Sequence, residues 1–367
     1  MTELIATPAA LADLARRLTG APWIALDTEF MRVDTYRARL CLVQLASAEI
    51  VACIDVLAIE DLAPLFERLH DPATLKVLHA ARQDLEVLHD QDGRIPAPLF
   101  DTQIAAALAG YADQVGYATL VEAECGERLP KLHTRADWAQ RPLPEEMIRY
   151  AADDVVYLRE VYRRLHDKLE KLGRLDWLRE ECAQHIDPAR YRNDPELAYQ
   201  RLGGGRLPLP AQTRLQALAA WRERTAIQHN RPRGWIVKDP ALVDIARRNP
   251  ASVDDLSTIA DLPPAVIRRR GEELIATLRE ANARPPQRWY LDLPPLSAME
   301  QAQLSRLSEL VKATAERQGL PATLLATRTD LTALVRGARD GRVLQGWRGS
   351  VLGDALRQCF RIMFPLP

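Results

Sequence analysis

The chain has few cysteines, no long hydrophobic run and almost no net charge, and each of these absences excludes a class of protein. Its five cysteines among 367 residues are odd in number and scattered, so they predict neither a disulfide framework nor a zinc site. No apolar run is long enough to span a membrane, and the N-terminus lacks the basic start and apolar stretch of a signal peptide. We therefore expect a reducing, cytoplasmic setting.

The charge balance limits how this chain could bind nucleic acid. With 49 Lys and Arg against 50 Asp and Glu, the formal net charge is -1, which argues against a purely electrostatic coat. A binding face needs only a local cluster of cations, so RNA and DNA are not excluded. The length of 367 residues predicts two or three domains.

The first part of the chain alternates strand and helix patterns. Short apolar runs predict strands at 23–26, 40–45, 50–54 and 75–78, and helical spacing lies between them at 57–69 and 85–88. From Pro144 onward, apolar residues at steps of three and four indicate a long amphipathic helix that begins at this proline. Short strands mixed with helices predict an α/β layer fold with ligands at the strand ends.

The second part is predicted to be helical and repeated. Three consecutive glycines at 203–205, followed by two prolines, indicate a linker. Beyond it, six residues between positions 215 and 247 recur 89 residues further on, between 304 and 336, and a seventh, Ile236, is matched by Leu325. We predict a first domain at 1–175, a linker at 176–206, and two copies of a small all-α module at 207–288 and 293–367.

Two carboxylates follow the first apolar strand run. Asp27 and Glu29 are two positions apart, so on a strand their side chains point to the same face. Adjacent like charges are unfavourable unless a cation neutralises them, and oxygen ligands suit Mg²⁺ or Mn²⁺. For an isolated motif of this length, the simpler interpretation, in which acidic residues end a strand and cap a turn, would be favoured.

Three further residues could complete the site. Asp84 follows the predicted strand at 75–78 and should lie in the first turns of the next helix, where an acid is also favoured by the helix dipole. Tyr150 and Asp154 are four apart on the long helix and can face the same edge of the sheet. A tyrosine there could hydrogen-bond a water while the carboxylate holds a metal; the alternative is a half-buried Tyr beside a solvated Asp.

The order of these residues resembles that of the DEDDy 3′→5′ exonucleases. These enzymes carry Asp-x-Glu on the first strand, an Asp after a later strand, and Tyr-x-x-x-Asp on a helix; a histidine subgroup would need His at position 149, which is Arg. Within this class the chain resembles the ribonuclease D family. The resemblance extends over these segments: Leu26-Asp27-Thr28-Glu29-Phe30, Val43-Gln44-Leu45, Leu78-His79-Ala80, Phe100-Asp101-Thr102-Gln103, Gln114-Val115-Gly116-Tyr117 and Asp137-Trp138-Ala139-Gln140-Arg141-Pro142-Leu143.

The resemblance implies a fold and an activity. The fold is a ribonuclease H-like, mixed-sheet exonuclease domain followed by two helicase-and-ribonuclease-D C-terminal (HRDC) domains. The activity is removal of 3′-terminal nucleotides from RNA, with tRNA precursors as substrates and nucleoside 5′-monophosphates as products. No membrane and no obligate protein partner are implied.

The resemblance also implies a role for each residue of the site. Two divalent cations, Mg²⁺ or Mn²⁺, would clamp the scissile phosphate. Asp27 would bridge them, Glu29 and Asp154 would hold one and Asp84 the other, and Tyr150 would orient the attacking water. Next to Asp84, the segment Ala81-Arg82 is bulkier than the family's small residues, which predicts a different local groove.

Other residues are weaker candidates for substrate contact. Thr28 and Phe30 adjoin the two strand carboxylates, and the Phe30 ring could stack on a terminal base or belong to the core. His79 could touch substrate at a strand end, although a structural histidine is the simpler interpretation. Asp101 is more simply an N-cap than a metal ligand. An excess of arginine at 214–248 could contact phosphates or be solvated; we assign three of its members to RNA: Arg222, Arg231 and Arg233.

Two rival functions remain at this point. A DNA 3′→5′ exonuclease would share the metal site, but the repeated C-terminal modules favour ribonuclease D. A non-catalytic RNA-binding protein on a nuclease fold would normally have lost a ligand, and all four carboxylates are present.

Overall fold

The computed structural model describes residues 2–129, 136–290 and 294–363, which form two compact units. The first unit comprises Met1–Met31, Leu40–Pro188 and Leu296–Pro367; the second comprises Arg32–Arg39 and Ala189–Pro295. Among the described residues, no helix has the length and apolar character needed to cross a membrane.

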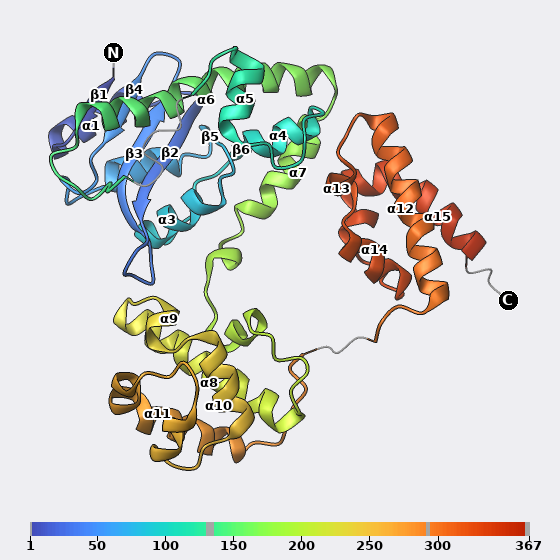
Figure 1. The fold of residues 1–367 in the computed structure, drawn as a ribbon. Helices are drawn as coiled ribbons and strands as arrows, with labels where there is room; N and C mark the ends of the chain where they lie inside the picture. Colours follow the sequence, from blue (N-terminus) through green and yellow to red (C-terminus); the bar gives the residue numbers. More distant parts are fainter. Residues whose placement is uncertain (1, 130–135, 291–293, 364–367) are drawn as a thin grey trace. The chain divides into compact units, whose positions relative to one another are not determined.

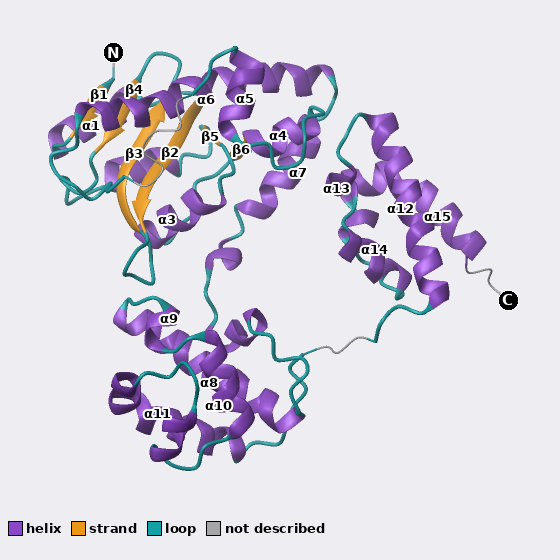
Figure 2. Ribbon diagram, viewed as in Figure 1, coloured by secondary structure: helices purple, strands orange, loops and turns teal. Residues whose placement is uncertain are grey.

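A mixed six-stranded sheet lies in the first unit (Figures 1 and 2). Its strands, in sequence order, are β1 (Glu3–Ile5), β2 (Trp23–Met31), β3 (Arg39–Ala46), β4 (Val51–Ile54), β5 (Leu75–Leu78) and β6 (Leu99–Asp101). Their order across the sheet is β1-β4-β3-β2-β5-β6. The β3–β4 pair is antiparallel, whereas the β1–β4, β2–β5 and β5–β6 pairs are parallel. The prediction of an α/β mixed-sheet fold is confirmed.

The structure corrects the predicted bounds of one strand and one helix. The strand predicted at 23–26 continues to Met31, so Asp27 and Glu29 lie within β2 rather than at its end. The helix predicted at 57–69 begins only at Ala63. The preceding residues form a turn in which the Leu57 amide donates to Asp55, and Pro64, which lacks an amide hydrogen, occupies the first turn of the helix.

The described residues of the nuclease part of the first unit form these helices: α1 (Pro8–Arg17), α2 (Ala63–Leu69), α3 (Arg82–Asp92), α4 (Thr102–Leu108), α5 (Tyr117–Cys125), α6 (Glu145–Lys171) and α7 (Leu175–His185). The long helix α6 has acidic residues in its first turn and lysines in its last, as the helix dipole favours. Its apolar face packs against β2, β4 and β5. The helix predicted to begin at Pro144 is therefore confirmed, and it crosses the sheet at the strand that carries Asp27.

The two C-terminal modules have matching helices. The first module contains α8 (Leu209–His229), α9 (Arg233–Ile236), α10 (Asp239–Arg248) and α11 (Pro264–Asn282); the second contains α12 (Ala298–Gln318), α13 (Ala322–Leu325), α14 (Arg328–Val335) and α15 (Gly346–Met363). Each of the first three helices of the second module starts 89 residues after its counterpart in the first module. The long first helix ends at a left-handed residue, Asn230 or Gly319, and the next helix is preceded by Pro232 or Pro321. The sequence repeat thus encodes the same stop and start signals twice.

The stretch predicted as a linker contains ordered structure. Besides most of α7, it holds two 3-10 helices, Pro188–Tyr191 and Pro195–Arg201. Gly204 lies so close to Tyr290 and Leu215 that a Cβ at this position would overlap the tyrosine ring. Glycine at 204 is therefore required for close packing against the core of the first module.

Candidate active site

Three of the predicted metal ligands converge in the first unit. Asp27 and Glu29 project from one face of β2, and Asp154 comes from α6, which packs on that strand. Each offers a carboxylate oxygen, and these oxygens all lie within 4.8 Å of one another. The tertiary fold therefore brings together acids that are about 125 residues apart in the sequence.

The fourth carboxylate is held beside this group. Asp84 is the third residue of α3, and its side chain is buried, with 8 % of its surface exposed. It accepts a 2.5 Å hydrogen bond from Oγ1 of Thr28, the residue between Asp27 and Glu29. Thr28, proposed from the sequence as a substrate contact, is thus 6 % exposed and bonded to a neighbouring carboxylate.

The raised pKa values of the four carboxyl groups favour binding of a cation. Burial raises the pKa of Asp27 to about 6. Burial and then the charge of Asp27 raise the pKa of Asp154 to about 8 and that of Glu29 to about 9, and the same two causes raise the pKa of Asp84 well above its ordinary value. Four carboxylates that resist ionisation together are a donor set that a divalent metal ion stabilises, because it neutralises their charge and accepts hard oxygen ligands.

Tyr150 lies one helical turn before Asp154 and packs against the ring of Trp138, with the ring centroids 6.3 Å apart. Burial, then the charges of Asp154 and Glu29, raise the pKa of the Tyr150 phenol to about 12. The hydroxyl is therefore protonated at neutral pH, and it can donate a hydrogen bond to a ligand of the acidic group.

The loop that carries Trp138 is clamped by Arg141. Its Nε and Nη2 both contact the Asp55 carboxylate at 2.7 Å, and Nη2 also donates to the Cys41 carbonyl at 2.8 Å. This bidentate pair ties the 137–143 segment to the sheet at β3 and to the end of β4. The family-like residues of that segment therefore position Trp138, and through it Tyr150.

His79 and Tyr117 form a second polar group beside Asp154. The His79 Nδ1 lies 3.0 Å from Thr102 Oγ1, and its ring is 5.3 Å from that of Tyr117, whose hydroxyl donates to the Asp154 carbonyl. Burial lowers the pKa of His79, so the ring is neutral at neutral pH. Its Nε2 has no hydrogen-bond partner among the described residues. The sequence alone indicated no role for Tyr117.

Asp101 has the structural role that the sequence indicates. Its carboxylate caps α4 by accepting from the Gln103 amide at 2.8 Å, and it also accepts from the amides of Ala80 and Ala81. Ala80 has a positive φ of 53°, an uncommon conformation for a residue with a side chain. The capping carboxylate holds this bend, which leads the chain from β5 into α3 and to Asp84.

A cavity of about 790 Å³ opens beside these residues, and its wall includes Thr28, Phe30, His79 and Asp84. The Phe30 ring is partly exposed on this wall. Of the predicted substrate contacts in the first unit, all three therefore border one space, next to the acidic group.

The three arginines of the second unit have different environments. Arg222 is 4 % exposed and donates to the Val237 carbonyl and to Asp239. Arg233 pairs with the buried Glu223 through Nε at 2.5 Å and Nη2 at 2.6 Å. Arg231 is at the surface, with its guanidinium 5.7 Å from the ring centroid of Trp235 and its Nη1 3.4 Å from the carboxylate of the exposed Asp34. Two of the three thus bind side chains within their own module.

Comparison with known proteins shows the family to which the chain belongs. Residues 2–170 match the family model described as 3'-5' exonuclease, and residues 211–278 match that of the HRDC domain. The ribonuclease D of Granulibacter bethesdensis is 43 % identical over 94 % of this chain and 89 % of its own length, and that of Acidiphilium cryptum is 43 % identical over 96 % and 92 %. The crystal structure of Escherichia coli RNase D covers 99 % of both chains with 33 % identity and a TM-score of 0.89.

The mixed sheet, the acids on β2 and α6, and the matched exonuclease family together define a 3′→5′ exonuclease. The similarity to curated relatives is not confined to that domain but runs through both C-terminal modules. The chain belongs to the ribonuclease D family.

Proposed function

We propose that this 3′→5′ exoribonuclease removes nucleotides one at a time from the 3′ end of RNA, by hydrolysis at the acidic group, and releases nucleoside 5′-monophosphates. The observation that carries the proposal is the convergence of Asp27, Glu29 and Asp154, with Asp84 held alongside by Thr28. Membership of the ribonuclease D family supports the choice of RNA.

The four carboxylates would hold two divalent cations, Mg²⁺ or Mn²⁺. The raised pKa values of Asp27, Glu29 and Asp154 support this, because the ionised cluster is stable only when positive charge is added. When bound, the cations would supply charge neutralisation at the scissile phosphate and activation of water.

The remaining residues of the site position the reactants. The protonated Tyr150 hydroxyl donates a hydrogen bond that orients the attacking water for in-line displacement. Thr28 holds Asp84 at the edge of the cluster. His79 offers its buried, unpartnered Nε2 to a polar group of the terminal nucleotide, and Phe30 offers a ring on which the base can stack.

We propose tRNA precursors as substrates and a reducing, cytoplasmic setting. The E. coli enzyme whose structure covers 99 % of this chain is described as an exoribonuclease involved in structured RNA processing. The five cysteines form no disulfide, which supports the reducing setting.

A 3′-extended tRNA tests the function. We expect the full-length protein with Mg²⁺ to shorten the extension in single-nucleotide steps and release 5′-monophosphates, and to be inactive in EDTA. A DNA oligonucleotide of matched sequence, included in parallel, distinguishes a DNA exonuclease. RNA binding without any shortening would indicate a non-catalytic RNA-binding protein.

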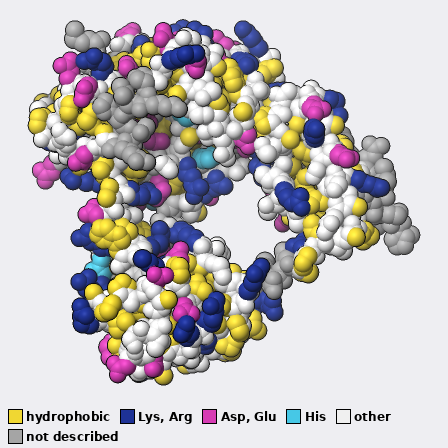
Figure 3. Space-filling model, viewed as in Figure 1, with side chains coloured by type: hydrophobic (Ala, Val, Ile, Leu, Met, Phe, Trp, Pro, Cys, Tyr) yellow, Lys and Arg dark blue, Asp and Glu magenta, His cyan; other side chains and the backbone are white. Residues whose placement is uncertain are grey.

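We also propose that the first C-terminal module contacts RNA at a groove between α9 and α11. A cavity of about 370 Å³ is lined there by His229, Arg231, Trp235, Ile236, Arg269 and Arg270. Trp235 is 59 % exposed, and Arg231 lies over its ring. An exposed aromatic ring among arginines suits stacked bases and their phosphates; Figure 3 shows Lys and Arg side chains beside hydrophobic ones on this unit. We assign RNA contact to this groove rather than to Arg222 and Arg233, because those two guanidinium groups pair with Asp239 and Glu223 of the same module.

Replacing Trp235 with alanine should weaken RNA binding about tenfold, because base stacking on an aromatic ring is worth about 1–3 kcal/mol per base. Leu197→Ala is the matched control, since Leu197 is also exposed and apolar in the same unit but lies outside the groove. Binding of a fluorescent, single-stranded RNA in EDTA measures both affinities. Equal affinity of Trp235→Ala and the parent would remove the groove from the RNA path.

A further inference from the structure

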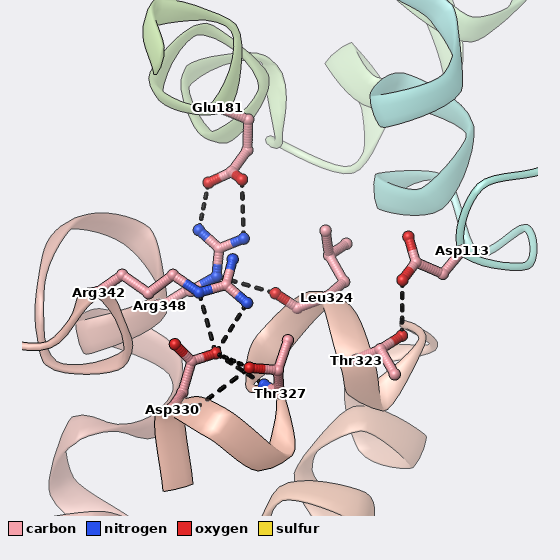
Figure 4. A network of polar contacts seen from close by, with 8 residues as sticks. All are labelled: Asp113, Glu181, Thr323, Leu324, Thr327, Asp330, Arg342 and Arg348. Atoms are coloured by element: carbon pink, nitrogen blue, oxygen red, sulfur yellow. Dashed lines mark hydrogen bonds and ion pairs between the residues drawn. The ribbon is translucent and has the colours of Figure 1, made fainter. Parts of the chain in front are cut away.

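The second C-terminal module is fixed to α7 by a buried polar joint (Figure 4). The Arg348 guanidinium, 1 % exposed, pairs with both oxygens of Glu181, and its Nη2 lies 2.7 Å from Oε2. The Arg348 Nε donates to the Leu324 carbonyl, and the Trp347 indole donates to Glu181 at 2.7 Å. Because the carboxylate and guanidinium are desolvated together and also satisfied by further hydrogen bonds, separating them would leave buried charges unpaired.

Two further contacts support this joint. The rings of Trp177 and Trp347 stack, with centroids 4.7 Å apart and planes 14° from parallel. Arg174 connects the same two parts of the chain, donating to the carbonyls of Leu108 and Gln318 at 2.7 and 2.6 Å. The second module is therefore packed against the nuclease domain as part of the first unit.

The second module borders the cavity that begins at the active site. From Thr28 and Asp84 the cavity of about 790 Å³ extends to Thr327 and Arg342 of the second module. Its volume is in the upper part of the range of about 300–1,000 Å³ that is usual for ligand sites in proteins. The space next to the acidic group thus has one side from the nuclease domain and another from the second module.

The acidic residues on this cavity wall already have partners. Asp101 accepts from the amides of Ala80 and Ala81, and Glu181 is paired with Arg348. Asp113 accepts a 2.8 Å hydrogen bond from Thr323, and Asp84 belongs to the catalytic cluster. Of these acids, Glu181 is neutralised by a cation, whereas Asp101 and Asp113 are oriented by neutral donors and keep their charge. A phosphate in this cavity therefore needs cationic partners on the same wall.

Two arginines on the wall retain unused donors. Arg82, exposed in the first turn of α3, makes no hydrogen bond or ion pair with any described residue. Arg342 is held by Asp330 through Nε and Nη2, at 3.0 and 2.9 Å, and its Nη1 donates to no described residue. A guanidinium that is oriented by a carboxylate on one edge can bind a phosphate on the other.

We propose that this cavity holds the RNA nucleotides immediately upstream of the 3′-terminal one, and that Arg82 and Arg342 contact their phosphodiesters from the nuclease domain and the second module, respectively. The proposal rests on the exoribonuclease function proposed above. It assigns to Arg82, which departs from the small residues of the family, a role in substrate binding, and it makes the second module part of the substrate site.

Full-length Arg82→Gln and Arg342→Gln test the proposal, with Arg306→Gln as control because Arg306 is exposed on α12 of the same module but lies away from the cavity. Steady-state hydrolysis of a dinucleotide and of a hexanucleotide RNA is measured with Mg²⁺. The dinucleotide carries only the scissile phosphate, so it has no upstream phosphodiester. We expect each cavity variant to raise KM for the hexanucleotide about tenfold, with kcat little changed, and to leave KM for the dinucleotide within about twofold of the parent.

The dependence on salt gives a second readout. For each cavity variant, the slope of log affinity for the hexanucleotide against log salt concentration should fall by about 1, because one phosphate contact is lost. A KM ratio between the two substrates that matches the parent's in both variants overturns the proposal. If Arg342→Gln does not fold, Arg82→Gln decides alone, since Arg82 has no partner to lose. Failure of the parent to hydrolyse either RNA would instead contradict the proposed function.

Discussion

Replacing Asp27 with asparagine should slow RNA hydrolysis by more than about a hundredfold while leaving the protein folded. Asp27 is central to the acidic group, because its charge raises the pKa of Glu29, Asp84 and Asp154. Loss even of residues that only support metal ligands costs about 10–100-fold, so a ligand itself should cost more. Single-turnover digestion of RNA with Mg²⁺ measures the effect. Asp153→Asn is the matched control: it removes a neighbouring acid of α6 that lies outside the group of three. Activity of Asp27→Asn within tenfold of the parent would contradict the metal assignment.

Asp27→Asn, which should lower activity, should also make the thermal stability of the protein less sensitive to high pH. A carboxylate whose folded pKa is raised stabilises the protein below its unfolded pKa of about 4, and this contribution is lost as the pH rises through the folded pKa. For Asp27 and Glu29 that range extends to about 6 and about 9, respectively. In EDTA the parent should therefore melt at a lower temperature at pH 9 than at pH 6, and Mg²⁺ should reduce the difference. Asp27→Asn should show a smaller decrease; thermal melts with equal pH dependence would rule this out.

Replacing Tyr150 with phenylalanine should lower kcat by about a hundredfold or more, in the range usual for a group that positions or transfers a proton. The phenol is protonated at neutral pH, since its pKa is raised to about 12, so removing the hydroxyl removes a hydrogen-bond donor and no charge. The ring still packs against Trp138. Calorimetric titration with Mn²⁺ should therefore give the same affinity as the parent.

Tyr157→Phe is the control for this prediction, because Tyr157 lies two turns further along α6 and takes no part in the acidic group. Its turnover should equal that of the parent. Unchanged turnover in Tyr150→Phe would show that Tyr150 is only structural, and a large loss of Mn²⁺ affinity would show that the hydroxyl acts through the metal site.

The sequence alone determined the features that depend on local geometry. Asp27 and Glu29 had to share a face because strand side chains alternate, and Tyr150 and Asp154 had to be neighbours because a helix turns every 3.6 residues. The repeat of 89 residues predicted two copies of one helical module. In the structure, a left-handed residue, Asn230 or Gly319, ends the long helix at equivalent positions in the two copies. These are properties of short segments, which the chain specifies wherever they are packed.

The tertiary structure decided which partner each polar side chain has, because such pairs join segments that are distant in sequence. Arg231, Arg233 and Arg222 look alike in the sequence, yet only Arg231 lies over an exposed tryptophan, while the other two satisfy acids of their own module. The second module repeats the first in sequence, yet a buried pair between Arg348 and Glu181 fixes it to the nuclease domain. Composition and periodicity are alike for a solvated arginine and a buried one; burial, which sets the cost of an unpaired charge, is known only once the chain is folded.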